Sequence, residues 1–395
     1  MVSKLGSAFL DGLQNQTFGS LRVIGTAKHY LGTGAMKWDT SGNPDFKIDQ
    51  GITYASEATL RKTHLPPFAA AVKAGVNSVM VGHTTWNGIE LAANKYLLTD
   101  VLKGELGFNG LVVSDWYGIY EIPGGQYNAV VAAINAGVDM VMLPYDYLLF
   151  TVYMRLALAQ GDITTDRLND AVSRILRAKF ATGLFDEKPT LNLSLNELGS
   201  AQRREVAREA VRKSLVILKN NDHLLPLPKT AGKIIVAGSA ADNLGRQAGG
   251  WTVEWQGIDG NWIAGTTILN GIRQAVSPTT TVEYDQAGNF QQSTSPADIG
   301  IAIVGEKPYA EGWGDNPHPT LTDDDLATIR KVKQASKKII VIIVSGRPLD
   351  IKPYARDWDA IIAAWLPGSE GGGIADILFG DYPFTGTLPI AWEIQ

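Results

Sequence analysis

The stretch Leu111-Val-Val-Ser-Asp-Trp116 is the most informative part of the sequence for the fold. Three apolar residues with strand character run directly into Ser114, Asp115 and Trp116, which places a carboxylate and an indole where the strand ends. Parallel α/β folds keep their chemistry at the carboxyl ends of their strands. Asp115 is therefore the first candidate for a catalytic residue, although a lone Asp in this position is more often a helix cap.

Similar apolar runs surround this stretch and alternate with helical periodicity. We expect strands over residues 23–25, 78–81, 111–113 and 140–143. Helices are expected over residues 66–74, 97–106, 130–136 and 166–184, and within an amphipathic segment over residues 1–19. This βα repetition predicts a parallel sheet in a first domain over residues 1–190.

The rhythm of the sequence changes near residue 190. A polar connector over residues 190–197, a helix over 201–215 and the proline-containing stretch His223-Leu-Leu-Pro-Leu-Pro228 predict a linker over residues 191–228. Residues 229–395 contain apolar runs of the fully buried type, expected as strands over 233–238, 281–284, 300–305, 338–345 and 360–365, with a helix over 323–335. The second domain is thus also predicted to be α/β.

Two glycine-rich stretches of the second domain carry further candidates. Gly249-Gly-Trp-Thr-Val-Glu-Trp255 lacks helical periodicity and is expected to be a loop whose Trp251 and Trp255 can offer an indole face to a sugar. Gly305-Glu-Lys-Pro-Tyr-Ala-Glu-Gly-Trp-Gly-Asp315 follows a buried strand and holds three carboxyls, Glu306, Glu311 and Asp315. A carboxyl that is poorly solvated beside aromatic rings has a raised pKa, as a general acid requires.

Ala27-Lys-His-Tyr30 follows the strand expected over residues 23–25. Lys28 and His29 can donate hydrogen bonds to the hydroxyls of a neutral ligand, and the alternative is an ordinary surface pair.

Composition excludes several classes of function. The chain has 395 residues, a net charge of −5, 45% hydrophobic residues and no cysteine. Without a run of Lys or Arg it offers little to a nucleic acid, and no stretch reaches the length of a membrane span. Residues 1–19 lack the features of a signal peptide.

Together these motifs resemble glycoside hydrolase family 3, in its exo-β-glucanase and β-glucosidase branch. The resemblance spans residues 20–392 and also includes Ser345-Gly-Arg-Pro348 and Trp365-Leu-Pro-Gly-Ser-Glu-Gly371. It implies a TIM-type (β/α)8 barrel followed by an α/β sandwich domain, and a retaining enzyme that needs no cofactor or metal and releases glucose from the non-reducing ends of β-glucosides or β-glucan oligosaccharides. For a full-length parent it suggests a periplasmic or secreted location.

The resemblance also implies a role for each candidate residue. Asp115 is expected to be the nucleophile and Glu311 the acid/base, which agrees with the two carboxyls that retaining hydrolysis requires. The two residues stand in different domains, so we expect the site between the domains. The other expected site residues are Lys28 and His29 at glucose hydroxyls, Trp116 and Trp255 around the next sugar, Trp251, His83, and Glu306 and Asp315 in support.

The sequence departs from the family's pattern in three places. A barrel of this type has eight strands in about 250 residues, whereas the first domain supplies four strand candidates, so the carboxy-terminal half of a barrel is predicted. We therefore expect the chain alone to have little activity, and to be poorly soluble, self-associate or need a complementing amino-terminal half. Thr33 stands where the branch usually has Asp, and His83 where plant-type members have Tyr, so substrate preference is expected to differ.

Two other classes of function remain as alternatives. A truncated relative that keeps its Trp residues could act as a non-catalytic glycan-binding protein, which the intact Asp115 and Glu311 argue against. A nucleotide-binding α/β protein would require a phosphate loop near Gly238 or Gly305, and neither position carries a Gly-x-Gly-x-x-Gly or Walker pattern.

Overall fold

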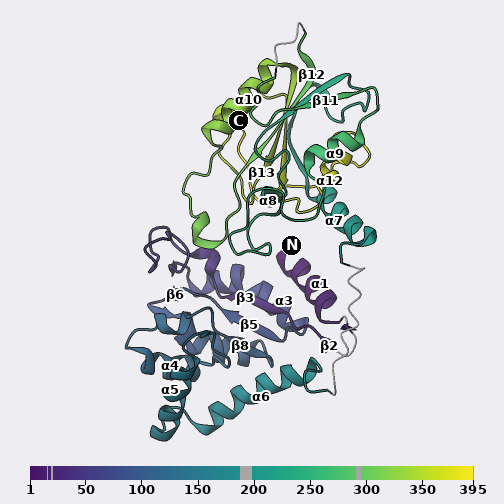
Figure 1. Ribbon diagram of the computed structural model, residues 1–395. Helices are drawn as coiled ribbons and strands as arrows, with labels where there is room; N and C mark the ends of the chain where they lie inside the picture. The colour runs from purple at the N-terminus through teal and green to yellow at the C-terminus, as the bar shows by residue number, and fades with distance from the viewer. Residues whose placement is uncertain (16, 19–20, 187–197, 291–294, 395) are drawn as a thin grey trace. The chain divides into compact units, whose positions relative to one another are not determined.

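The computed structural model describes residues 1–15, 17–18, 21–186, 198–290 and 295–394. The chain divides into an amino-terminal unit, Met1–Ser194, and a carboxy-terminal unit, Leu195–Gln395. Each unit has its own hydrophobic core and combines helices with parallel strands (Figure 1). The α/β character predicted for both parts of the chain is confirmed.

The amino-terminal unit is organised around a sheet of three parallel strands. Its strand order is β3 (Thr26–Tyr30), β5 (Ser78–Val81) and β8 (Leu111–Val113), and Met140 adds a parallel bridge to Val113. Val79 and Val112 are fully buried, as expected for strands covered on both faces. Three parallel strands and the bridge at Met140 therefore lie side by side and run in the same direction.

Helices connect and cover these strands. They are α1 (Val2–Gln14), α2 (Glu57–Thr59), α3 (Leu65–Lys73), α4 (Gln126–Ala136), α5 (Tyr147–Gln160) and α6 (Thr165–Ala181), with π-helical turns η2 (Leu60–His64) and η4 (Tyr96–Glu105) and 3-10 turns η1 (Thr33–Ala35), η3 (Leu91–Ala93) and η5 (Gly118–Glu121). Two small sheets, which the sequence did not reveal, are formed by β1 (Thr17–Phe18) with β2 (Leu21–Arg22), and by β4 (Ile52–Thr53), β6 (Thr85–Trp86) and β7 (Ile89–Glu90).

Two strand predictions in this unit need correction. Residues 23–25 are not a strand, because the strand begins at Thr26 and includes Lys28 and His29, which were expected after its end. Of residues 140–143 only Met140 makes a strand-like bridge. In the first case the strand continues past the apolar run into polar residues. In the second case the strand-like pairing ends at Met140, although residues 141–143 are also apolar.

The carboxy-terminal unit contains a six-stranded sheet in the order β11-β10-β12-β13-β14-β9. The strands are β9 (Val216–Asn220), β10 (Lys233–Ala237), β11 (Thr281–Tyr284), β12 (Ala297–Gly305), β13 (Ser336–Val344) and β14 (Ala360–Trp365). Neighbouring strands are parallel except β9, which runs antiparallel to β14 at the edge.

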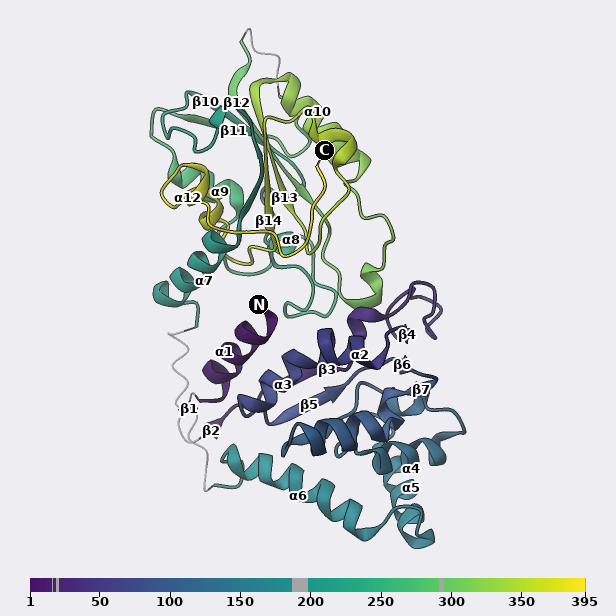
Figure 2. The same cartoon turned by 180° about the vertical axis from the view of Figure 1, so that it is seen from behind.

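Helices cover both faces of this sheet (Figure 2). Helices α7 (Ala201–Ser214), α9 (Ile268–Ala275) and α12 (Gly372–Leu378) pack on one face, and α10 (Asp323–Gln334) packs on the other. The short helices α8 (Leu244–Ala248) and α11 (Lys352–Ala355) and the 3-10 turns η7 (Asn221–His223) and η8 (Glu311–Gly314) complete the unit. Ile234 and Ile235 are both buried but belong to opposite core layers, because successive strand side chains point to opposite faces.

The segment expected as a linker over residues 191–228 contains regular structure. Helix α7 belongs to a core layer of the carboxy-terminal unit, and β9 pairs with β14 in its sheet. The whole polar connector expected over residues 190–197 lies outside the described residues.

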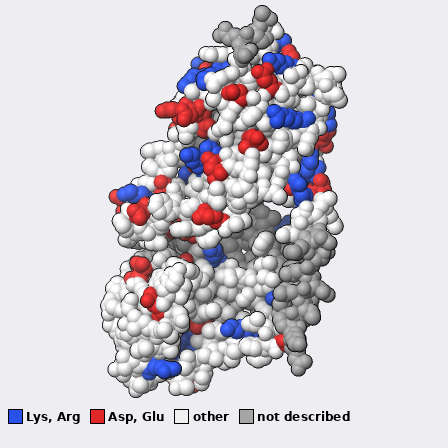
Figure 3. Space-filling view, viewed as in Figure 1, with Lys and Arg blue, Asp and Glu red and all other residues white. Residues whose placement is uncertain are grey.

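Acidic and basic side chains are interspersed on the face of the molecule seen in Figure 3. Within the described ranges, no helix combines the length and apolar character needed to cross a bilayer.

Candidate active site

Asp115 lies directly after β8, at the carboxyl end of the parallel sheet. Its Oδ1 accepts the backbone N–H of Trp116 at 2.7 Å, and its side chain is 22% exposed. The preceding Ser114 is buried, and its hydroxyl accepts the N–H of Met142 at 2.9 Å, which ties this turn to the next segment of the sheet. Asp115 is therefore held in a fixed position while one oxygen remains oriented toward His29.

His29 approaches Asp115 from β3, which lies on the other side of β5. Its Nε2 lies 3.5 Å from Asp115 Oδ2. Burial lowers the pKa of His29 and outweighs the opposing effect of the Asp115 carboxylate. His29 is consequently neutral near pH 7, so the carboxylate faces a polar ring rather than a compensating cation. Lys28, on the same strand, is exposed.

His83 follows β5 and lies beside the same turn. Its buried Nε2 has no hydrogen-bond partner among the described residues, and its nearest acidic group is Glu121 Oε1 at 3.9 Å. Gly118 packs against both His83 and Asp115, since a Cβ at this position would meet them at 3.2 and 3.4 Å. The structure thus brings His29, His83 and Asp115 to one end of the sheet, each from a different strand.

An ion-pair network that the sequence analysis did not predict anchors β8 beneath Asp115. The buried Asp139 accepts the N–H of Val112 at 2.8 Å and binds Lys103 Nζ at 2.8 Å and the guanidinium of Arg167. Burial lowers the pKa of Lys103 to about 8, although Asp139 opposes the shift. In the sequence, nothing in Ala136-Gly-Val-Asp139, just before Met140, indicates that Asp139 anchors β8.

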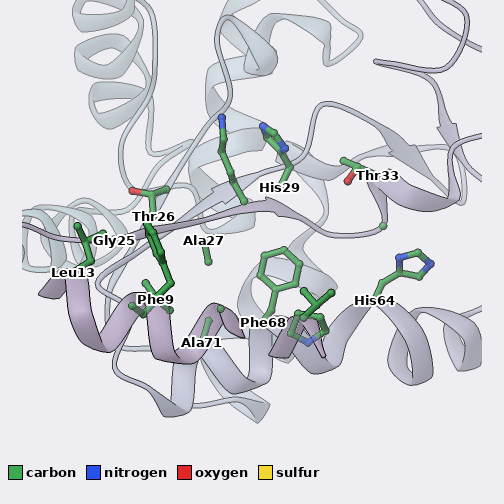
Figure 4. A pocket seen from close by; sticks show the side chains of 16 residues that line it. Phe9, Leu13, Gly25, Thr26, Ala27, His29, Thr33, His64, Phe68 and Ala71 are labelled. Carbon is green, nitrogen blue, oxygen red and sulfur yellow. The ribbon is translucent and has the colours of Figure 1, made fainter. Parts of the chain in front are cut away.

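A cavity of about 420 Å³ lies between α1, β3 and α3 (Figure 4). Its lining is mainly apolar and includes Phe9, Leu13 and Phe68, with His29, Lys28 and His64 also contributing. In Figure 4, His29 points to the other side of β3 from Phe68. Because Asp115 is absent from the lining, this apolar cavity is adjacent to the candidate site rather than part of its catalytic surface.

Trp116 extends the amino-terminal part of the site with an exposed indole. It is 53% exposed and makes an edge contact with Tyr117, with ring centroids 6.2 Å apart. An indole ring with this exposure can stack against a sugar ring.

In the carboxy-terminal unit, the loop after α8 presents two further indoles. Trp251 and Trp255 are exposed, and their ring centroids lie 6.4 Å apart. The backbone N–H of Trp251 donates to the backbone carbonyl of Trp255 at 2.8 Å. The segment is a loop, as predicted, and this tight return brings the two rings together.

The second loop of this unit, residues 305–315, is fixed by Glu306. Its Oε1 accepts hydrogen bonds from Arg347 Nη2 at 2.7 Å and Nε at 3.0 Å, and its Oε2 accepts the Tyr309 hydroxyl at 3.0 Å. Arg347 also lies over the Tyr309 ring, 4.8 Å from its centroid, and donates to the Gly314 carbonyl at 2.6 Å. We call Glu306, Tyr309 and Arg347 the clamp.

The clamp separates the roles of the two glutamates in this loop. Glu306 is committed to the clamp, whereas Glu311 begins the 3-10 turn η8, is exposed, and has a positive φ of 52°. Such a conformation is uncommon for a residue with a side chain and is kept only where surrounding contacts impose it. The exposure of Glu311 corrects the expectation of a poorly solvated carboxyl. Asp315, at the end of η8, is partly buried.

Tyr309 also joins the two loops of the carboxy-terminal unit. Gly250 approaches the Tyr309 carbonyl so closely that a Cβ would lie 2.1 Å from it, and the N–H of the next residue, Ala310, donates to Gln256 at 2.9 Å. Its ring packs on Gly314, where a Cβ would be 2.3 Å away. Trp251, Trp255 and Glu311 are therefore presented by two loops that hold each other in place.

Sequence reasoning missed Tyr309 and Arg347 as site residues. Arg347 lies within Ser345-Gly-Arg-Pro348, which the resemblance included, but its partner is 41 positions away. No group of three His, Asp or Glu side chains suited to a metal is found among the residues that the structure describes.

Comparisons with known proteins match both units to models of one family. Residues 1–178 match the glycosyl hydrolase family 3 N-terminal domain, and residues 215–395 match the glycosyl hydrolase family 3 C-terminal domain. A lysosomal β-glucosidase of Dictyostelium discoideum is 32% identical over 99% of this chain and 51% of its own length. A β-xylosidase of Formosa agariphila is 31% identical over 99% of this chain and 57% of its own length.

A solved structure gives the same fold. The exo-1,3/1,4-β-glucanase of a Pseudoalteromonas species superimposes with a TM-score of 0.89 and 36% identity, over 99% of this chain and 50% of that one. The chain therefore spans about half the length of the relatives it matches. The predicted architecture, part of a TIM-type barrel followed by an α/β sandwich, is confirmed by this likeness.

Proposed function

Because the chain belongs to glycosyl hydrolase family 3, we propose that it supplies the catalytic residues of a retaining β-glucosidase or exo-1,3-1,4-β-glucanase. The observation that carries the proposal is Asp115, fixed by the Trp116 N–H at the end of β8 with its second oxygen 3.5 Å from a neutral His29. The β-glucosidase and β-glucanase named among its relatives support a β-glucoside as the substrate.

In the first step, Asp115 attacks the anomeric carbon and Glu311 protonates the departing oxygen. The bond to the aglycone breaks as a covalent glucosyl ester forms on Asp115. In the second step, Glu311 takes a proton from water, the water attacks the same carbon, and the ester bond breaks to release glucose with its configuration retained. This chemistry needs the two carboxyls about 5 to 5.5 Å apart across one glycosidic bond.

Polar and aromatic residues around Asp115 have roles in binding. Lys28 and His29 donate hydrogen bonds to glucose hydroxyls, and the buried Nε2 of His83 has unused hydrogen-bonding capacity for another. Trp116 stacks on the following sugar, and Trp255 and Trp251 do the same from the other unit. Glu306 acts through the clamp, and Asp315 ends the turn that carries Glu311.

We also propose that full activity needs a complementing amino-terminal barrel segment. Three helices of the amino-terminal unit leave apolar rows exposed, and these rows are Val2, Leu5 and Phe9 on α1, Leu148, Val152 and Leu156 on α5, and Val172, Leu176 and Phe180 on α6. Such rows on an unpartnered surface mark sites of association. A full-length parent of this kind is proposed to act outside the cytoplasm.

The proposal is tested by trapping the covalent intermediate. The chain, alone and fused to the amino-terminal barrel segment of the Pseudoalteromonas enzyme, is incubated with an activated 2-deoxy-2-fluoro-β-glucoside and digested for mass spectrometry. We expect a fluoroglucosyl ester on the peptide containing Asp115 in the fused protein. Labelling at another carboxyl, or turnover of aryl β-xylosides well above that of aryl β-glucosides, would contradict the mechanism or the substrate class.

A further inference from the structure

Arg246 is a largely buried cation that joins two loops of the carboxy-terminal unit. It lies in the short helix α8 (Figure 1), which leads directly into the loop that carries Trp251 and Trp255. Its side chain is 11% exposed, and its Nη1 donates to the carbonyl of Gly305 at 3.0 Å. Gly305 ends β12 and begins the loop that carries Glu311. A side chain from the helix that precedes the first loop thus contacts the start of the second.

The loop that carries the two indoles is closed at its base by Asp259. Its Oδ1 lies 3.1 Å from Arg246 Nε and accepts the side-chain N–H of Asn243 at 2.6 Å. Burial alone would raise the pKa of Asp259, but hydrogen bonds from Arg246 and Asn243 lower it overall, so the carboxyl is ionised near pH 7. The N–H of Gly245 donates to the carbonyl of Gly260 at 2.8 Å. The two ends of this loop therefore meet beside Arg246.

The guanidinium of Arg246 is itself held by a buried polar group. Its Nη1 donates to the Ser239 hydroxyl at 2.7 Å, and this hydroxyl donates to Asp325 Oδ1, also at 2.7 Å. Asp325 stands in the first turn of α10 and is 4% exposed. The position of Nη1 is therefore set by residues that belong to neither loop.

The loop over residues 305–315 depends on such contacts because its own regular structure is limited to the turn η8. It contains three glycines, which leave the backbone conformationally free. Arg347 donates to the carbonyl of Gly314 near the end of the loop, and Arg246 holds its start. Glu311 lies between these two points, with a positive φ that surrounding contacts must impose.

We propose that Arg246 is a positioning residue for the acid/base step, which holds the start of the Glu311 loop against the base of the loop that carries Trp255. This inference rests on the proposed function, in which Glu311 protonates the departing oxygen and Trp255 stacks on the following sugar. Arg246 acts through the two loops and not on the substrate. It keeps the Glu311 carboxyl and the indole in one arrangement, and a misplacement of about 1 Å can lower a rate about 10²-fold.

The first test follows amide hydrogen exchange in the full 395-residue chain and in its Arg246→Met variant, which removes the donors but keeps an unbranched side chain. We expect exchange over residues 249–258 and 305–315 to become at least about tenfold faster, because both loops lose a tether and open more often. Exchange over residues 201–214 of α7 should not change. The exposed Arg273→Met is the control and should leave both loops as they are.

The second test measures kcat/KM of the fused protein on two substrates. A misplaced general acid matters most when the leaving group needs a proton, so Arg246→Met should lower kcat/KM for laminaribiose at least about tenfold, but that for a dinitrophenyl glucoside less than about threefold. A role in stability alone would lower both equally. Glu311→Ala is measured beside it, as the variant that removes the acid itself.

Two outcomes would overturn this role of Arg246 alone. One is loop exchange that Arg246→Met does not alter. The other is a split between the two substrates for Glu311→Ala without a split for Arg246→Met. If Glu311→Ala itself shows no split, the proposed function fails, and the role of Arg246 fails with it.

Thermal unfolding checks that each variant folds. If Arg246→Met does not fold, Asp259→Asn replaces it, because the amide keeps the shape of the side chain but removes the charge that pairs with Arg246. The same two loops are then expected to exchange several-fold faster than in the wild-type chain, and unchanged exchange would overturn the proposal.

Discussion

Arg347 and Glu306 form a two-donor ion pair across 41 positions of sequence, with Nη2 and Nε of Arg347 at 2.7 and 3.0 Å from the same carboxylate oxygen. Both side chains are largely removed from solvent, at 27% and 14% exposure. Arg347 also binds the carbonyl of Gly314, the last residue of the turn that Glu311 begins. The position of the proposed acid/base therefore depends on an arginine located outside its own loop.

Breaking this pair is expected to destabilise the carboxy-terminal unit. Arg347→Met leaves Glu306 with Tyr309 as its remaining partner in the clamp, and hydrogen bonds to charged groups contribute about 1.5 to 3 kcal/mol. We expect a loss of about this size in the free energy of unfolding by urea. The exposed Arg273→Met on α9 is the control, and equal midpoints for the two variants would show that the clamp adds no stability.

Asp115→Asn is expected to abolish turnover while keeping the fold. The amide preserves the shape of the side chain but removes the attacking charge, so hydrolysis of an aryl β-glucoside by the fused protein should fall by several orders of magnitude. Asp100→Asn, an exposed carboxyl of the same unit, is the matched control. Near-normal turnover by Asp115→Asn would exclude it as the nucleophile.

Glu311→Ala should separate substrates by their leaving groups. A dinitrophenyl glucoside needs no proton for departure, so its first step should be nearly unaffected, whereas cleavage of laminaribiose should be strongly reduced. Added azide should restore turnover and yield β-glucosyl azide, because the covalent intermediate stays open to small anions. Equal losses on both substrates would instead indicate a structural role for Glu311.

His29 is expected to make stability depend on pH. Its pKa is lowered on folding, so the unfolded chain takes up a proton at higher pH than the folded chain does. The folded state should therefore lose stability as the pH falls through the unfolded value of 6.5 toward the lower folded value. Thermal unfolding between pH 7.5 and 5.5 should show a steeper decline for the wild-type chain than for His29→Gln, and parallel curves would contradict this.

The exposed apolar rows of the amino-terminal unit predict self-association of the isolated chain. Replacing Val172 and Leu176 on α6 by Lys puts two charges into one row, and we expect light scattering to show smaller species than for the wild-type chain. The same change to Lys at the exposed Leu198 and Val206 of the carboxy-terminal unit is the control. A wild-type chain that is monomeric and turns over an aryl glucoside at about 1 to 10³ per second would refute the requirement for a complementing segment.

The sequence predicted those elements in which hydrophobic pattern and backbone pairing coincide. The strands Leu111–Val113, Thr281–Tyr284 and Ala360–Trp365 have the expected bounds, because each is an apolar or alternating run with polar residues or turns on both sides. Strand β3 was displaced, because it continues to Tyr30 through the polar residues Lys28 and His29, which lie at the register shift between Ala27 and Tyr30. Strand β9 was assigned to a linker, because most of its residues are only partly buried.

The same limit applied to the candidate site. Motifs contiguous in sequence, such as Ser114-Asp115-Trp116, identified Asp115 and its neighbouring indole. The distances from Asp115 to His29 and from Glu306 to Arg347 join residues 86 and 41 positions apart, and only the folded chain brings them together. Local sequence patterns therefore identified the candidate site residues, but not the distant residues that contact them in the fold.

The edge position of β9 has a consequence for how the carboxy-terminal unit is made. Val216 pairs with Ala363, so a strand at the start of this unit finds its neighbour in the sheet near the unit's end. A ribosome must deliver almost the whole unit before that pairing can form, and contacts so distant along the chain slow folding. Until then β9 has no neighbouring strand to pair with. Its pairing with β14 is therefore one of the last steps in forming the unit during synthesis.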